Sequence, residues 1–200
     1  MKRGFDIILA GAGLFLFSPV MMAVTLAIKL LSPGPVLYKA ARVGKGGRVF
    51  SMVKFRTMVI DADKNGPLVT AGNDTRVTGI GRFLRTTKLD ELPTLWNVLI
   101  GDMSLVGPRP ENPSSAALYT EPQRRIWTVR PGLTSPATVK YRHEEALLAG
   151  ARDLDKRYFE IMQDKLKLEL EYLDNRSFLR DVVILLQTLQ AIFHIKVSSA

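Results

Sequence analysis

The chain has 200 residues, enough for one domain with a sizeable core. Its 28 Lys and Arg against 19 Asp and Glu give a net charge of +9, which favours an anionic partner: nucleic acid, anionic lipid or a phosphorylated metabolite. The sequence has no cysteine, which excludes disulfides, thiolate catalysis and zinc–thiolate sites, and its two histidines, His143 and His194, are far apart, which argues against a histidine-based metal site.

The first predicted element is an apolar segment, residues 7–28, which carries no charge. At about 1.5 Å per residue a helix of this length spans about 33 Å, enough for a hydrocarbon core of about 30 Å. A cleaved signal peptide would also begin with cations such as Lys2 and Arg3. This run, however, is longer than a usual signal core, and the chain after it looks like part of the same domain. From composition alone, a simple spanning helix is the default interpretation.

A re-entrant helix, which enters and leaves the membrane on one face, is the alternative that we favour. Ser18 and Pro19 lie near the middle of the apolar run, where a proline removes a hydrogen bond and bends the helix. Basic residues flank the run on both sides, which argues that both ends stay in the cytoplasm. They are Lys2 and Arg3 before it, and Lys29, Lys39, Arg42, Lys45 and Arg48 after it. A kinked spanning helix tolerates such a proline too, so the topology stays open at this point.

The remaining elements predict a helix-rich α/β fold. Two short strands over 36–42 and 48–55 follow a breaker at 31–35, and the glycines between them favour a β-hairpin. The later expected elements are a polar loop over 57–80, a short helix over 92–100 ended by Gly101, a helix between Ser114 and Trp127, and two helical stretches over 153–173 and 176–195. The last stretch has a broad apolar face, which favours core packing, with a helix lying in the membrane interface as the alternative.

Two adjacent acids, Asp90 and Glu91, stand just before the predicted short helix. Adjacent residues on a helix point about 100° apart, so this pair would divide labour rather than share one proton: one would attack, and the other would bind metal or orient groups. Basic residues flank the pair and would hold phosphates against it while favouring its ionised form. They are Arg82, Arg85, Lys88 and Arg109. On local sequence alone, an ordinary helix start, with Asp as N-cap and Pro in the first turn, is the favoured explanation of this pattern.

Three further patterns carry weaker signals. Asp61 and Asp63 form a D-x-D triplet, which holds a divalent ion in many nucleotide-sugar glycosyltransferases but is more often a solvated loop or a helix cap. Lys54 and Arg56 put two cations at the end of a strand, where a solvated sheet edge is the simpler explanation. Arg142 follows a loop rich in Pro and Gly and could be a second anion clamp or a surface ion-pair partner. No predicted helix carries a basic stripe, which argues against nucleic-acid binding.

Longer motifs carry a resemblance to a known family. After the apolar segment broken at Ser18 and Pro19 come SPGPVLYKAARVGKGGRVFSMVKFRTM (32–58), LDELPTLWNVLIGDMSLVGPRPE (89–111) and PGLTS (131–135). Together they closely resemble the bacterial sugar transferases, or monotopic phosphoglycosyl transferases, over roughly residues 1–195. The resemblance implies a re-entrant membrane helix over 1–35 and a small α/β catalytic core with interfacial helices over 36–200, built as one continuous unit.

That resemblance also implies a reaction. Such enzymes move a phospho-sugar from a nucleotide diphosphate sugar, usually UDP-linked, onto a polyprenol phosphate such as undecaprenyl phosphate, and release UMP. The step begins the synthesis of membrane glycans such as exopolysaccharide, requires a divalent ion, usually Mg²⁺, and takes place at the cytoplasmic face of the bacterial inner membrane. The expected partners are therefore the UDP-sugar, the polyprenol phosphate and the bilayer, with a homodimer as one compatible assembly.

The resemblance also implies roles for individual residues. Asp90 would be the nucleophile that forms a covalent phospho-sugar intermediate, and Glu91 would assist at the metal or orient the acceptor, so both are candidate metal ligands. Arg109 would contact the nucleotide-sugar. Arg85 and Arg142 are candidate phosphate clamps, and Lys54 and Arg56 are further phosphate-binding candidates.

One departure leaves the sugar open, because many members read PGLTGxW where this chain reads PGLTSPATVKYRHEE. Two rival functions also remain. One is a glycosyltransferase that uses Asp61 and Asp63 for metal and releases UDP. The other is a non-catalytic basic scaffold anchored in the membrane.

Overall fold

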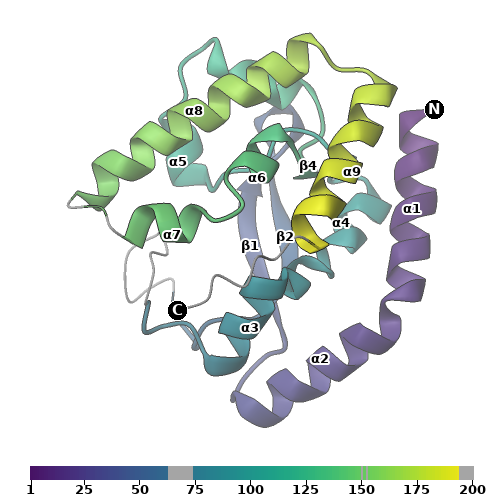
Figure 1. Cartoon of the computed structure of the whole chain (residues 1–200), viewed down its shortest axis with the longest axis vertical. Coiled ribbons are helices and arrows are strands. Elements are labelled where there is room, and N and C mark those ends of the chain that lie inside the picture. The colour runs from purple at the N-terminus through teal and green to yellow at the C-terminus, as the bar shows by residue number, and fades with distance from the viewer. Residues whose placement is uncertain (63–73, 150, 152, 194–200) are drawn as a thin grey trace.

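The computed structural model describes residues 1–62, 74–149, 151 and 153–193 (Figure 1). Its α-helices are α1 (Lys2–Leu16), α2 (Ser18–Leu31), α3 (Gly79–Thr87), α4 (Thr94–Ile100), α5 (Pro113–Ala117), α6 (Pro136–Lys140), α7 (Glu144–Ala149), α8 (Leu154–Asp174) and α9 (Phe178–Phe193). Its 3₁₀ turns are η1 (Lys45–Gly47), η2 (Leu89–Glu91) and η3 (Gln123–Thr128), and its strands are β1 (Leu37–Val43), β2 (Val49–Phe55), β3 (Ser104–Val106) and β4 (Gly132–Thr134). The predicted helix-rich α/β class is confirmed.

The apolar N-terminal segment is a bent pair of helices. α1 ends at Leu16 and α2 starts at Ser18, with a bend of 58° between their axes. Pro19 lies in the first turn of α2, where its missing N–H costs least, and the Ser18 hydroxyl donates to the Phe15 carbonyl oxygen at 2.7 Å. Among the described residues no single helix is long and apolar enough to cross a membrane, whereas the bent pair together meets that length and composition.

The outer side of this pair is open and apolar. Figure 1 shows α1 and α2 along one edge of the molecule, with α1 beside α4 and α9 on its inner side. Large apolar side chains are exposed there, among them Ile8, Phe15, Leu16, Met22 and Leu30. Exposed apolar side chains at this density mark a surface that meets something other than water.

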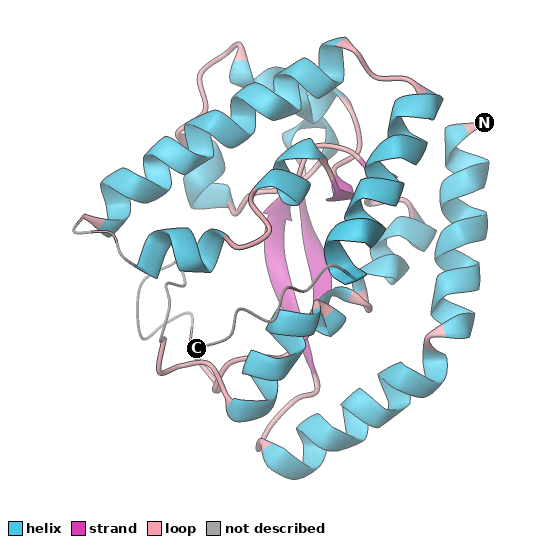
Figure 2. Ribbon diagram, in the orientation of Figure 1, coloured by secondary structure: helices cyan, strands magenta, loops and turns pink. Residues whose placement is uncertain are grey.

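Two small sheets organise the rest of the chain. β1 and β2 form the predicted antiparallel hairpin (Figure 2). Ala40 lies opposite Met52 in it, and both side chains are buried. β3 and β4 form a second, parallel pair that the sequence did not predict, because three-residue strands carry too little periodicity. The predicted helix between Ser114 and Trp127 is divided into α5 and η3.

α4 packs in the centre of the largest core. Val98 and Met103 are completely buried beside Ala10 of α1. The buried Asn97 side chain also ties α4 to the hairpin, because it accepts from the Val53 backbone N–H at 2.9 Å and donates to the Ser51 carbonyl at 2.8 Å. As predicted, the helix ends at Gly101, whose φ of +100° suits glycine. The catalytic candidates immediately before α4 are thus attached to a rigid element.

α9 buries only part of its apolar face. Ile184 is buried, but other apolar side chains of the helix are exposed: Phe178, Leu179, Val183, Leu186 and Leu189. Core packing, the favoured explanation from the sequence, therefore accounts for one side of α9 only. The remaining apolar stripe matches the interfacial alternative in pattern.

Gly81 of α3 marks a point where two backbones touch. A Cβ at Gly81 would lie 1.9 Å from the Thr57 carbonyl oxygen, whereas a Cβ at Gly79 of the same helix meets no atom within 4 Å. We expect Gly81→Ala to destabilise the protein by about 3 kcal/mol or more, because α3 must move away from the backbone of Thr57, just after β2. Gly79→Ala is the matched control and should be neutral or stabilising by up to about 1 kcal/mol. Urea unfolding of both variants in detergent checks this, and equal stabilities would contradict it.

Candidate active site

A tight reversal of the chain turns the two acids into the protein. Lys88 ends α3 with a left-handed φ of +60°, and η2 follows immediately. A non-glycine residue in this conformation is rare and is held in place by its surroundings. α4 begins only at Thr94, two residues later than predicted, so Asp90 and Glu91 belong to η2 rather than to the helix. Asp90 is 8% exposed.

Glu91 lies between two cations from distant parts of the chain. Its Oε1 accepts from Lys54 Nζ at 2.8 Å and from an Arg109 guanidinium nitrogen at 2.6 Å. Arg109 reaches Glu91 from the turn after β3, and Lys54 reaches it from the end of the hairpin strand β2. The Glu91 and Lys54 side chains are only 16% and 17% exposed, so the simpler explanation of Lys54, a solvated sheet edge, is wrong.

The pKa values in this cluster shift as the geometry requires. Burial opposes the charge on Glu91, but Arg109 and then Lys54 outweigh it and hold the pKa of Glu91 well below its usual range. Glu91 raises the pKa of Arg109, while burial lowers the pKa of Lys54 despite the attraction of Glu91. Glu91 is therefore ionised at neutral pH and engaged by two donors.

Asp90 has a different environment from its neighbour. Burial raises the pKa of the Asp90 carboxyl, Glu91 raises it further, and the charges of Lys54, Lys88 and Arg85 lower it only in part. Its Oδ1 is buried without a hydrogen-bond partner. The sequence suggested that nearby cations would favour an ionised Asp90. In the structure, burial outweighs the cations and raises the pKa of Asp90, whereas Lys54 and Arg109 bind Glu91. A buried carboxylate oxygen without a hydrogen-bond partner makes Asp90 a candidate for a reactive group or a metal ligand.

The other three predicted cations lie in different settings. Arg85 donates from Nε to the Thr57 hydroxyl at 2.9 Å and lies close enough to lower the pKa of Asp90. Arg56 is buried and binds the Ser32 carbonyl at 2.9 Å and the Pro35 carbonyl at 2.5 Å, so it fastens the turn after α2, with one guanidinium nitrogen unpartnered. Arg142 lies between α6 and α7 and makes no ion pair within the described part of the chain.

The rival D-x-D site is only partly visible. Asp61 lies in a turn after β2 with a left-handed φ of +59°, and Asp63 falls outside the described residues. Among the described residues no group of three or more His, Asp or Glu side chains is arranged to hold a metal ion. The carboxylates that a metal could use near the cation cluster are Asp90, through its free Oδ1, and Glu91, whose Oε2 has only a 3.4 Å contact with Arg109.

Glu169 of α8 supports the site and was missed from the sequence. Its Oε1 accepts from the Ser135 hydroxyl at 2.6 Å and from the Arg109 backbone N–H at 3.2 Å. The side chain is 3% exposed, and burial raises its pKa to about 7. The signal was available, because Met162, Leu166 and Glu169 follow helical spacing and place a carboxyl at a core position.

Glu169→Gln is expected to flatten the pH dependence of stability. The folded pKa of about 7 exceeds the ordinary value of 4.5, so the native state binds a proton more tightly than the unfolded chain. Stability from this group is complete below about pH 4.5 and is lost as pH rises through about 7, an effect of about 3 kcal/mol. Urea unfolding at pH 5 and pH 8 measures it. The exposed Glu171→Gln serves as control, and an unchanged slope in Glu169→Gln would contradict this assignment.

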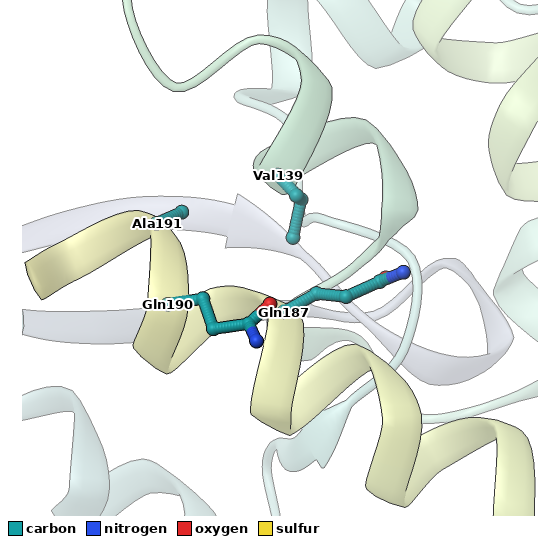
Figure 3. Close-up of a pocket in the computed structure, with 4 residues that line it drawn as sticks. All are labelled: Val139, Gln187, Gln190 and Ala191. Carbon is teal, nitrogen blue, oxygen red and sulfur yellow. The ribbon is translucent and has the colours of Figure 1, made fainter. Parts of the chain in front are cut away.

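A separate hollow of about 460 Å³ lies between α6 and α9. Figure 3 shows the four residues that line it, Val139, Gln187, Gln190 and Ala191. None of them belongs to the acid–cation cluster, which consists of Asp90, Glu91, Lys54 and Arg109, and none is an acid, a cation or a nucleophile. The lining of this hollow therefore offers no group suited to phosphoryl transfer, and Asp90 and Glu91 of η2 remain the catalytic candidates.

Comparison with known proteins identifies the family. The family model described as bacterial sugar transferase matches residues 1–195. The chain belongs to the bacterial sugar transferases. The bent helix pair, the hairpin and the acid–cation cluster all lie within the matched region.

Three relatives illustrate the range of this sugar transferase family. The chain is 39% identical over 197 residues to a UDP-N-acetylgalactosamine-undecaprenyl-phosphate N-acetylgalactosaminephosphotransferase of Aeromonas hydrophila, covering 96% of this chain and 43% of that protein. It is 38% identical over 194 residues to a UDP-glucose:undecaprenyl-phosphate glucose-1-phosphate transferase of Caulobacter vibrioides, with 96% and 69% covered. It is 38% identical over 195 residues to an exopolysaccharide production protein of Rhizobium leguminosarum, with 94% and 92% covered. The chain thus spans less than half of the first relative and most of the third.

Proposed function

We propose that this chain transfers a phospho-sugar from a UDP-sugar to a polyprenyl phosphate and releases UMP. The names of the Aeromonas and Caulobacter relatives support the donor and acceptor classes. One observation supports the chemistry most directly. Asp90 is buried with an unpartnered Oδ1, directly beside a Glu91 held by Lys54 and Arg109.

In the first proposed step, Asp90 is the nucleophile. One carboxylate oxygen of Asp90 attacks the β-phosphorus of the UDP-sugar, and the bond from that phosphorus to the bridging oxygen breaks, so UMP leaves with the bonding electrons. The carboxylate must be ionised to attack, and burial opposes that form. A low hydration of Asp90 also means that little water must be removed before the attack.

In the second proposed step, the acceptor phosphate releases the enzyme. An oxygen of the polyprenyl phosphate attacks the same phosphorus, the bond to Asp90 breaks, and the carboxylate is restored. Arg109 and Lys54 stabilise charge on the transferring group in both steps, since phosphoryl transfer depends mainly on positioning and cations. Glu91 keeps these two cations in place and completes their hydrogen bonds.

The residues present fit a divalent cation at this site. Asp90 Oδ1 has no donor, and hard cations such as Mg²⁺ prefer carboxylate oxygens together with substrate phosphates. Mg²⁺ would be held by Asp90, with Glu91 Oε2 as a second ligand, and would supply charge neutralisation on the phosphates. It would also favour the ionised form of Asp90 that burial disfavours.

The proposed location is the cytoplasmic face of the bacterial inner membrane. A soluble donor and a lipid acceptor can meet only at the membrane surface. The 58° bend between α1 and α2, with cations on both sides of the apolar run 7–28, supports a re-entrant segment. The exposed apolar stripe of α9 would lie in the interface beside it. A homodimer remains compatible with this placement.

A product assay tests the proposed function against its rivals. Purified chain in detergent or nanodiscs is given Mg²⁺, polyprenyl phosphate and a panel of UDP-sugars, and nucleotide release is read with UMP- and UDP-specific detection. We expect UMP with at least one sugar. Release of UDP would instead indicate the glycosyltransferase that uses Asp61 and Asp63. Release of neither nucleotide with the full panel would favour the lipid-binding scaffold.

A further inference from the structure

The first two turns of α1 contact both segments that carry the acid–cation cluster. Asp6 is 3% exposed, and its carboxylate accepts from the Ser104 hydroxyl at 2.9 Å and from the Leu105 backbone N–H at 3.1 Å. Both donors belong to β3, whose chain continues directly into the turn that carries Arg109. A buried carboxylate with two donors fixes these groups in one arrangement, because neither donor has water as an alternative.

Arg3 contacts the other segment. Its two terminal nitrogens donate to the carbonyl oxygens of Val98 at 2.6 Å and Leu99 at 2.9 Å. These carbonyls belong to the last turn of α4, where backbone acceptors lack helical partners and a cation is favoured by the helix dipole. α4 is a rigid element that begins just after Glu91, so a shift at its last turn moves η2 as well.

Lys2 closes the arrangement from a third direction. Its Nζ donates to the Val106 carbonyl oxygen at 2.9 Å and pairs with Asp181 of α9. Asp181 also accepts from the Tyr172 hydroxyl at the end of α8. In addition, the rings of Phe5 and Phe178 meet edge to face with centroids 5.1 Å apart, so α1 and α9 are joined by polar and apolar contacts.

We propose that Asp6 and Arg3 are positioning residues, which hold β3 and α4 in the register that lets Arg109 meet Glu91. The expected change in kcat rests on the proposed function, whereas the expected loss of the Glu91–Arg109 contact does not. The Glu91–Arg109 hydrogen bond at 2.6 Å joins residues from two segments, and α1 contacts the far end of each. Because α1 is also the first half of the bent apolar pair, the membrane segment and the active site depend on the same side chains.

Kinetics of the full chain in nanodiscs test this proposal. We expect Asp6→Asn to lower kcat for UMP release about 10- to 100-fold, because a misplacement near 1 Å costs about that much, while KM for both substrates changes less than about 3-fold. The double variant Asp6→Asn/Ser104→Ala should be no slower than Asp6→Asn alone, because both substitutions act on the same hydrogen bond between Ser104 and Asp6. Lys29→Gln, an exposed cation of α2, is the matched control and should leave kcat unchanged.

A second readout does not need activity. Phenylglyoxal modification of Arg109, mapped by peptide mass and normalised to the exposed Arg48, should become at least about 3-fold faster in Asp6→Asn and in Arg3→Gln, because Arg109 loses Glu91 as its partner. A wild-type modification rate and wild-type kcat in folded Asp6→Asn would overturn the proposal. If Asp6→Asn does not fold, Ser104→Ala gives the same two readouts with a smaller loss. Failure of the proposed function would appear separately: the wild-type chain would release no UMP, while Asp6→Asn would still make Arg109 more reactive to phenylglyoxal.

Discussion

Replacing Asp90 by Asn is expected to lower turnover by at least about 10³-fold while leaving the fold intact. Asn has the size of Asp but cannot attack phosphorus. Burial raises the pKa of Asp90, so its charged form opposes folding at neutral pH, and the neutral Asn should keep or increase the thermal stability. Loss of activity without loss of stability is the signature of a catalytic group rather than a helix cap.

Mass spectrometry of the intact protein measures the same variant in a second way. Incubation of the wild-type chain with UDP-sugar and Mg²⁺, without polyprenyl phosphate, should leave a phospho-sugar adduct that maps to Asp90. The Asp90→Asn chain should carry none. Asp102→Asn, the same substitution at a partly exposed residue of the turn after α4, is the matched control and should retain the adduct. Full turnover in Asp90→Asn would remove Asp90 from the mechanism.

Replacing Glu91 by Gln is expected to cost both stability and activity. The change removes the anion between Lys54 and Arg109 and leaves two partly buried cations uncompensated. Breaking a buried pair in this way costs about 3–5 kcal/mol, and the residual exposure of the site places the loss near about 3 kcal/mol. In a chain of this size that lowers Tm by roughly 6–12 °C.

The effect of Glu91→Gln on stability should depend on pH. Because the cations depress the pKa of Glu91, its stabilising contribution is complete above the ordinary glutamate range and is lost as pH falls through the lower folded pKa. The stability gap between wild type and Glu91→Gln should therefore narrow on acidification. Thermal unfolding at neutral and acidic pH measures it. Glu121→Gln, an exposed glutamate with a 3.6 Å ion pair, is the control and should change stability by less than about 0.5 kcal/mol; an equal effect there would refute the cluster's role.

Long periodic elements of the fold could be predicted from the sequence. The two C-terminal helices, the hairpin and the break at Ser18 and Pro19 were confirmed to within a few residues. Short elements were not predicted: α3, η2 and the β3–β4 pair are set by tertiary contacts, such as the approach of Gly81 to Thr57, rather than by periodicity.

The candidate site divides in the same way. Asp90, Glu91 and Arg109 could be singled out because they lie in one distinctive run, and the structure brings Glu91 and Arg109 together with Lys54. Glu169 could not be assigned to the site in advance, because nothing local shows that its carboxyl meets the Arg109 backbone N–H 60 positions away.

The sequence by itself determined the family, the residue types available for phosphoryl chemistry and an apolar N-terminal segment interrupted by proline, because these depend on composition and local pattern. Only the tertiary structure distinguished the environments of the two adjacent acids. Glu91 received the two cations and became a fixed anion, whereas Asp90 was buried with a free oxygen. Burial and long-range pairing set the pKa values of two adjacent carboxyls in opposite directions, and no local pattern encodes that difference.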